Sequence, residues 1–421
     1  MAIDNKDKKV LKSSIEREQN EVACSAECEK IKGSKNLNVP HLRFPEFSGE
    51  WKKHSLGEIG ETIIGLTYKP SDVVDNNGII VFRSSNIKNG MIDYSDLVRV
   101  NKHIKDKIIT KENDILVCAR NGSQRLIGKN AIIKQEDANN TFGAFMMVYR
   151  ANDNPFILPL LSTKKYFSQV GENLGARINQ ITTSDFNGFE FYFPENHAER
   201  TKIAELFRLL DERIATQNKI IEDLKKLKCA IIEKLYTEIQ GEEYSYGQLL
   251  EIVNERNKQM GYSNILSASQ EKGMVNREDL NLDIQFEHNN ISTYKIVREG
   301  DYVIHLRSFQ GGFAFSDKLG VCSPAYTILR PNRLLEFGYL SYYFMSQRFI
   351  KSLIIVTYGI RDGRSINVEE WLNMKTVIPS KEHQLHILKV LRSIEGKIKN
   401  EETYATCLSN QKQYLLQQMF I

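Results

Sequence analysis

The sequence predicts an α+β protein, in which two similar domains of mixed α/β structure are joined by two long helices that pair as an antiparallel coiled coil. Two observations predict this fold. The chain of 421 residues presents the same order of motifs twice, and each copy ends in a long segment whose apolar residues recur at alternating steps of four and three. Its 41% hydrophobic and 26% charged residues are typical of a folded globular protein.

The repeat is clearest where strand-like runs follow acidic turns. Glu112–Arg120 reads ENDILVCAR, and Glu299–Arg307 reads EGDYVIHLR. Further along, Gly175–Arg177 is matched by Gly359–Arg361. Gly, Asn and Asp turns separate short β-rich runs, which we expect at Ile79–Phe82, Ile115–Cys118, Phe145–Tyr149, Tyr302–His305 and Tyr326–Leu329, with helical stretches at Phe156–Val170 and Phe337–Ile350.

A proline closes each globular region and a heptad helix follows it. After Pro194, the first helix places apolar residues on one seam at Ile203, Phe207, Leu210, Ile214, Ile221, Leu224, Ile231 and Leu235. After Pro379, the second helix does so at Ile387, Leu391, Ile394, Ile398, Ala405, Leu408, Leu415 and Met419. Equivalent positions differ by 184 residues throughout. This is the spacing of a coiled-coil seam.

The polar exceptions on the two seams also match, and they predict how the helices pair. Gln217 corresponds to Glu401, and Lys228 corresponds to Lys412. A parallel pair would place the two lysines in contact, whereas an antiparallel pair places Lys228 opposite Ile394. We therefore predict antiparallel pairing, over a span of about 50 Å. The alternative is two unrelated amphipathic helices that each pack on their own domain.

The predicted organisation has five segments. A polar leader precedes ordered chain that begins at Val39–Pro45 (VPHLRFP). The segments are a flexible leader (1–38), a first domain (39–195), a first spacer helix (196–240), a second domain (241–380) and a second spacer helix (381–421).

Motifs that would indicate catalysis are absent. Gly122–Lys129 resembles a phosphate-binding loop, but five residues separate its glycines and Asn130 replaces the magnesium-binding Ser or Thr. Asn154-Pro155-Phe156 lacks the second proline of the Asn-Pro-Pro-aromatic motif of amino-methyltransferases. The pairs His383/His386 and Cys24/Cys28 have no further ligands at metal-site spacing. We expect no catalytic residue, metal or cofactor in this chain.

Recognition loops remain as the candidate functional feature, because Arg, Asn, Gln, Ser and aromatic side chains can contact phosphates and base edges. Solvated loop charges or ion-paired structural arginines are the alternative, above all for Arg177 and Arg361, which both copies retain. The candidates in the first copy are Tyr68, Lys69, Arg83, Ser84, Asn86, Arg120, Asn121, Ser123, Arg125, Asn179 and Gln180. Those in the second copy are Ser267, Ser269, Gln270, Arg307, Ser308, Gln310, Arg361, Arg364 and Asn367.

With these features in this duplicated order, the chain resembles the specificity subunits of type I restriction-modification systems. The resemblance rests on the start at Val39–Pro45, the Gly359–Arg361 motif, and the prolines that lead through Glu199 or Gln384 into the heptad helices; it covers about residues 39–421. It implies two target recognition domains, each reading half of a bipartite site in double-stranded DNA, and a coiled coil that fixes the spacer.

The resemblance also implies partners. Two modification subunits would dock on the helices and methylate adenine with S-adenosylmethionine, and restriction subunits that use ATP and magnesium would join them. The net charge of +4 is lower than expected for such a DNA-binding chain. The sequence lacks an apolar run long enough to span a membrane, and we expect a bacterial, cytoplasmic, DNA-associated protein. The alternatives are a self-sufficient DNA methyltransferase or nuclease, and a coiled-coil adaptor that binds only proteins.

Overall fold

The computed structural model describes residues 38–174, 179–269, 272–280, 288–305, 312–358 and 365–421. The chain divides into two compact units. Unit 1 comprises residues 1–214 and 407–421, and unit 2 comprises residues 215–406. The predicted leader (1–38) lies almost entirely outside the described residues.

Unit 1 is built on a four-stranded antiparallel sheet in the order β2-β11-β8-β9. Its strands are β2 (Glu61–Ile64), β11 (Met146–Arg150), β8 (Ile115–Cys118) and β9 (Asn130–Ile132). All four residues of β8 are buried, as expected for a continuous apolar run without alternation. A second sheet, in the order β10-β4-β7-β3, pairs β10 with β4 in parallel; its strands are β10 (Thr141–Phe142), β4 (Ile79–Phe82), β7 (Arg99–Val100) and β3 (Val73–Val74).

Short elements complete unit 1. The remaining strands are β1 (Lys52–Ser55), which pairs with β12 (Glu190–Phe193), and β5 (Ile87–Lys88), which pairs with β6 (Met91–Ile92). The helices are α2 (Leu56–Ile59), α3 (Asn154–Leu160), α4 (Lys164–Asn173), α5 (Thr183–Asn187) and the start of α6 (His197–Thr237). Single 3-10 turns lie at Pro70–Asp72, Ser84–Asn86, Asp106–Ile108, Gln124–Leu126 and Gln135–Asp137.

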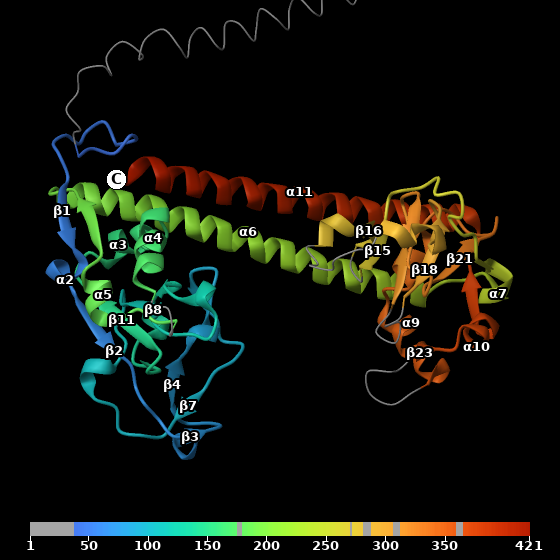
Figure 1. Cartoon of the computed structure of the whole chain (residues 1–421). Helices are drawn as coiled ribbons and strands as arrows, with labels where there is room; N and C mark the ends of the chain where they lie inside the picture. The colour runs from blue at the N-terminus through green and yellow to red at the C-terminus, as the bar shows by residue number, and fades with distance from the viewer. Residues whose placement is uncertain (1–37, 175–178, 270–271, 281–287, 306–311, 359–364) are drawn as a thin grey trace, which may run out of the picture. The chain divides into compact units, whose positions relative to one another are not determined.

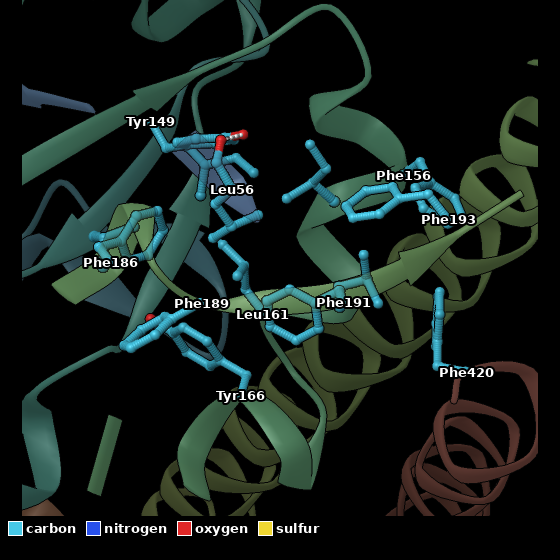
Figure 2. Packing of buried hydrophobic residues seen from close by; sticks show 14 of the residues in the cluster. Leu56, Tyr149, Phe156, Leu161, Tyr166, Phe186, Phe189, Phe191, Phe193 and Phe420 are labelled. Atoms are coloured by element: carbon cyan, nitrogen blue, oxygen red, sulfur yellow. Dashed lines mark hydrogen bonds between the residues drawn. The ribbon is translucent and has the colours of Figure 1, made fainter. Parts of the chain in front are cut away.

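The core of unit 1 is rich in aromatic rings, most of which pack in edge-to-face or tilted pairs (Figure 2). Trp51 packs edge-on against Phe156, with ring centroids 6.2 Å apart. Phe420, from beyond the end of α11, contacts Trp51, Phe156 and Phe207. The C-terminal residues are therefore part of this core and not a loose end.

Unit 2 repeats this plan. Its four-stranded antiparallel sheet has the order β14-β21-β18-β19, with strands β14 (Leu250–Val253), β21 (Thr327–Pro331), β18 (Tyr302–Ile304) and β19 (Phe313–Phe315). In sheet order these correspond one by one to β2, β11, β8 and β9 of unit 1. Four two-stranded pairs accompany it: β13 (Glu242–Ser245) with β24 (Lys375–Ile378), β15 (Leu266–Ser269) with β16 (Gly273–Asn276), β17 (Lys295–Val297) with β20 (Gly320–Cys322), and β22 (Thr357–Tyr358) with β23 (Ser365–Ile366).

The helices of unit 2 follow the same order as those of unit 1. They are α7 (Tyr246–Leu249), α8 (Tyr339–Tyr343), α9 (Gln347–Ser352), α10 (Val368–Asn373) and part of α11 (Lys381–Met419). Its 3-10 segments are Arg277–Leu280, His288–Thr293 and Leu353–Val356. The predicted pair of similar mixed α/β domains is confirmed.

A buried ion pair recurs at the acidic turn of each unit. Asp114 is 2% exposed and accepts two hydrogen bonds from Arg150, at 2.8 and 2.6 Å. Asp301 is also 2% exposed and accepts two from Arg330, both at 2.9 Å. The aspartate of each repeated motif thus binds an arginine on the equivalent neighbouring strand, which is β11 in unit 1 and β21 in unit 2.

Both predicted domain helices are shorter than expected. Each of the stretches Phe156–Val170 and Phe337–Ile350 contains two helices, because a hydroxyl cap starts a new one in the middle. Thr163 accepts a hydrogen bond from the amide of Tyr166 at the start of α4, and Ser346 accepts one from the amide of Phe349 at the start of α9. A Ser or Thr at this position satisfies amides that the first turn leaves unpaired.

The two long helices pair antiparallel within each unit (Figure 1). In unit 1, Lys412 of α11 bonds Asp211 of α6. In unit 2, Lys228 of α6 bonds Glu395 of α11 at 2.6 Å. These two ion pairs are equivalent in the repeat, because the two lysines are 184 residues apart and so are the two acids. The same offset separates Gln217 and Glu401, which are hydrogen-bonded to each other. The predicted antiparallel pairing is confirmed.

Candidate nucleic-acid interface

The loops that follow three strands of unit 1 gather at one edge because a single segment, Phe142–Met146, ties them together. Leu66, beyond β2, forms a parallel bridge with Gly143, and the amide of Gly143 donates to the carbonyl of Phe82 at 2.9 Å. The carbonyl of Phe145 accepts the amides of both Ala119 and Arg120 at 3.0 Å. The backbones approach so closely that a Cβ on Gly65 would lie 2.2 Å from the carbonyl oxygen of Gly143.

The loop after β8 is joined to two further segments. Arg120 forms an antiparallel bridge with Gln180. The Asn179 amide group donates to the carbonyl of Gly122 at 3.0 Å, and the Asn121 amide group donates to the Ser84 hydroxyl at 2.9 Å. Three clusters that lie far apart in the sequence, around residues 84, 121 and 179, therefore form one surface.

Several of the candidate side chains on this surface face solvent. Lys69, Arg120, Ser123 and Arg125 are exposed, and Gln180 is half-buried. In the described part of the chain, no carboxylate forms an ion pair with Lys69, Arg120 or Arg125. Such cations can bind an external anion without first breaking an internal bond.

The acids of these loops are already engaged. Asp72 bonds Lys102 at 3.4 Å, and the backbone amide of Lys69 lowers the pKa of this carboxyl, with a smaller contribution from Lys102. The hydroxyl and amide of Ser95 lower the pKa of Asp93 to about 2. Their negative charge is thereby committed within the loops.

Two candidates in unit 1 have internal roles instead. Asn86 is fully buried, and its amide group donates to the carbonyls of Asp93 and Asp96 at 3.1 and 2.8 Å. Arg83 pairs with Asp96 at 2.8 Å. The donors of Asn86 therefore hold the loop, and its contact with DNA stays a prediction. Tyr68 is half-buried against a cluster that contains Val81.

Fewer of the candidate residues in unit 2 lie within the described part of the chain. Ser267 and Ser269 are half-buried on β15, and the Ser269 hydroxyl accepts the amide of Lys272 at 3.3 Å. Asn367 caps α10 by accepting the amide of Glu370, so its predicted role in DNA contact is replaced by a structural one. The candidates Gln270, Arg307, Ser308, Gln310, Arg361 and Arg364 lie outside the described residues, as does Arg177.

Phe145 is not among the residues predicted from the sequence, yet it is 58% exposed on the unit 1 surface. The guanidinium carbon of Arg120 lies 5.1 Å from the centroid of its ring. Phe145 was assigned to a predicted strand, but β11 begins one residue later. Its signal in the sequence is the Gly143-Ala144 turn directly before it, and Tyr326 stands in the same place before β21.

The seam positions lie where two paired helices would bury them. All sixteen apolar positions and the four polar exceptions are buried or half-buried. Near the helix ends, neighbouring residues outside the predicted seam complete the globular cores: Ile232 and Tyr236 in unit 2, and Leu416 and Phe420 in unit 1. Here each helix faces a domain as well as its partner helix.

Two other kinds of feature are absent from the described residues. No group of three or more His, Cys, Asp or Glu side chains is placed to hold a metal ion. Within the same residues, no helix is both apolar and long enough to cross a membrane.

The chain is similar to several known proteins. Residues 48–226, which include the whole unit 1 surface, match the family described as type I restriction modification DNA specificity domain. Over these residues the chain is similar to type I specificity subunits. It is 27% identical over 194 residues to the type I restriction enzyme EcoKI specificity subunit of Escherichia coli, an alignment that covers 43% of this chain and 41% of that protein.

Other relatives align along more of the chain. The type I restriction enzyme MjaVIII specificity subunit of Methanocaldococcus jannaschii is 24% identical over 396 residues, which cover 85% of this chain and 88% of that protein. The crystal structure of the type I restriction-modification S subunit from M. genitalium superposes with a TM-score of 0.53 at 16% identity, covering 91% of this chain and 99% of that one. At this identity the structural likeness establishes the fold.

Proposed function

We propose that this chain recognises a bipartite site in double-stranded DNA, with each unit reading one half. The observation that carries the proposal is the loop surface of unit 1, where Arg120, Arg125 and Lys69 are exposed and form no ion pair with any described acid, and where Arg120 lies over an exposed aromatic ring. Side chains of these types bind phosphates and read base edges in the major groove. A near-neutral chain can bind DNA in this way, because the basic side chains are placed on one surface.

The long helices would set the spacing of the two half-sites and carry the modification subunits. α6 and α11 contain 41 and 39 residues, and a helix of this length extends about 60 Å. Away from its seam, the part of α6 that lies in unit 2 exposes Ile220 by 41% and Leu227 by 51%. Their spacing of seven residues keeps them on one face, which is a suitable docking surface for a modification subunit.

Catalysis would then reside in the partners. Adenine methylation would use S-adenosylmethionine bound by the modification subunits, and restriction subunits would supply the ATP- and magnesium-dependent steps. We assign no catalytic residue to this chain and expect the complex to act in the bacterial cytoplasm, on double-stranded DNA. The domain boundaries at 195, 240 and 380 remain predictions.

A domain exchange tests the proposal. Residues 40–195 are replaced by the corresponding domain of another specificity subunit, and the chimera is expressed with its modification subunits. Genome-wide mapping of methylated adenines should show one half of the recognised sequence changed and the other half retained. A chimera that changes both halves, or neither, contradicts the proposal.

Purified chain alone distinguishes the alternatives. Methyl transfer from labelled S-adenosylmethionine to DNA without a partner, or cleavage with magnesium alone, would indicate a self-sufficient enzyme. A complex with modification subunits that shows no DNA binding in a gel-shift assay would indicate an adaptor for proteins only.

A further inference from the structure

We propose that Arg120, held against the ring of Phe145, reads a guanine in the half-site of unit 1. This inference rests on the proposed function and assigns a base and a mode of contact to one residue of the surface. Three observations support it: a fixed backbone, a supported guanidinium group and donors without a described partner.

The backbone around Arg120 is held from both sides. The carbonyl of Phe145 accepts the amides of Ala119 and Arg120, both at 3.0 Å. On the other side Arg120 bridges Gln180, and the amide of Ile181 donates to the carbonyl of Ala119 at 2.9 Å. The side chain of Arg120 therefore starts from a defined point, which a residue in a free loop does not have.

The guanidinium group is supported by an aromatic ring. Its central carbon lies 5.1 Å from the centroid of Phe145, within the range of a cation–π contact. The Phe145 ring is 58% exposed and belongs to none of the described hydrophobic clusters, so it contributes little to folding. The exposed position of the Phe145 ring is explained if the ring orients the Arg120 side chain, so that this side chain loses less conformational entropy when DNA binds.

The donors of Arg120 have no partner among the residues that the structure describes. Within this part of the chain, its side chain forms no hydrogen bond and no ion pair. By contrast, the amide groups of Asn121 and Asn179 are both bonded within the loops. Arg120 thus combines an oriented planar group with N–H donors that no described residue binds, whereas Arg125 on the same loop is exposed and has no cation–π contact within the described part of the chain.

Guanine matches this arrangement in the major groove. It presents two acceptors, O6 and N7, to the two parallel donors of an arginine, whereas adenine presents one acceptor and one donor. An arginine fork on adenine would place a donor against a donor. Lysine keeps the positive charge but not the fork, so Arg120→Lys separates base reading from phosphate binding.

The experiment uses the full-length chain assembled with its modification subunits. Binding is measured at two salt concentrations to duplexes randomised across the unit 1 half-site. Arg120→Lys should reduce the preference for one guanine about tenfold to a hundredfold, and leave the other positions, the second half-site and the salt dependence unchanged. Phe145→Leu should weaken the same position, and Phe145→Tyr should retain it.

Arg125→Gln is the matched control for a phosphate contact. It should weaken binding to all sequences equally and reduce the slope of log affinity against log salt by about one. If Arg120→Lys behaves in this way, or if no guanine of the half-site depends on Arg120, the inference is overturned while DNA recognition by unit 1 stands. Failure of the proposed function itself is seen separately in the domain exchange.

Discussion

Replacing Arg43 with methionine should destabilise unit 1 by about 3–5 kcal/mol, the usual cost of removing one partner of a buried ion pair. Arg43 bonds both carboxylate oxygens of Glu199 at 2.7 Å, and Glu199 is only 1% exposed. The indole of Trp51 donates to the same carboxylate at 3.3 Å, which cannot neutralise its charge. Without Arg43, a buried negative charge near the start of α6 keeps a single neutral donor.

The internal repeat supplies a compensating change. Gln384, also fully buried, occupies the comparable place near the start of α11, where it bonds the carbonyls of Leu334 and Pro379 and needs no counter-charge. Adding Glu199→Gln to Arg43→Met should therefore recover the stability to within about 1 kcal/mol of the original chain.

Tryptophan fluorescence can follow unit 1 alone during unfolding in urea. The chain has two tryptophans, Trp51 in the core of unit 1 and Trp371 in that of unit 2. Trp371→Phe leaves Trp51 as the only reporter, and phenylalanine is the residue that unit 1 has at the matching place, Phe186. If Arg43→Met costs less than about 1 kcal/mol, or if Glu199→Gln fails to rescue it, the carboxylate does not depend on its counter-charge and the reasoning is refuted.

Three further results are expected. Leu227→Glu should weaken assembly with the modification subunits at least tenfold in a pull-down titration without changing the melting temperature, because Leu227 is 51% exposed; unchanged assembly would exclude this face of α6. The hydrogen bond from Lys397 lowers the pKa of Glu401, so the ionised carboxylate stabilises the fold above the ordinary glutamate pKa, and this stability is lost as the pH falls through the lower pKa of the folded state. In acid titrations Glu401→Gln should therefore lose less stability than the original chain. An identical acid profile for the two proteins would count against this role of Glu401. Burial raises the pKa of Cys118 to about 11 and that of Cys322 to about 12, so peptide mapping should find neither thiol alkylated at pH 8 until the chain is unfolded; alkylation of the native chain would contradict their burial.

The elements that the sequence predicted correctly are those whose side-chain pattern depends on local geometry. The two heptad seams follow from the helical repeat, and the matched lysines already favoured antiparallel pairing. The structure supplies the acids that bind Lys228 and Lys412, namely Glu395 and Asp211. Neither acid lies on the seam itself, so a search restricted to seam positions could not find them.

The individual roles of loop residues could not be predicted in the same way. An asparagine has the same donors whether it faces DNA or its own backbone, and the sequence does not distinguish the two. Asn86 and Asn367 belong to the second kind, since one is buried among carbonyls and the other caps a helix. Phe145 shows the reverse case, because the sequence places it in the strand-like run 145–149, whereas its ring lies before β11 and is 58% exposed.

Leu416, Met419 and Phe420 belong to the same buried cluster as Trp51, and this has a consequence for synthesis on the ribosome. Residues 215–406 of unit 2 form one continuous stretch, which can close as soon as it has emerged. Unit 1, although it leaves the ribosome first, waits for residues from more than three hundred positions further along the chain. Domains usually fold in the order in which they are translated, whereas here the core of the N-terminal unit is completed last.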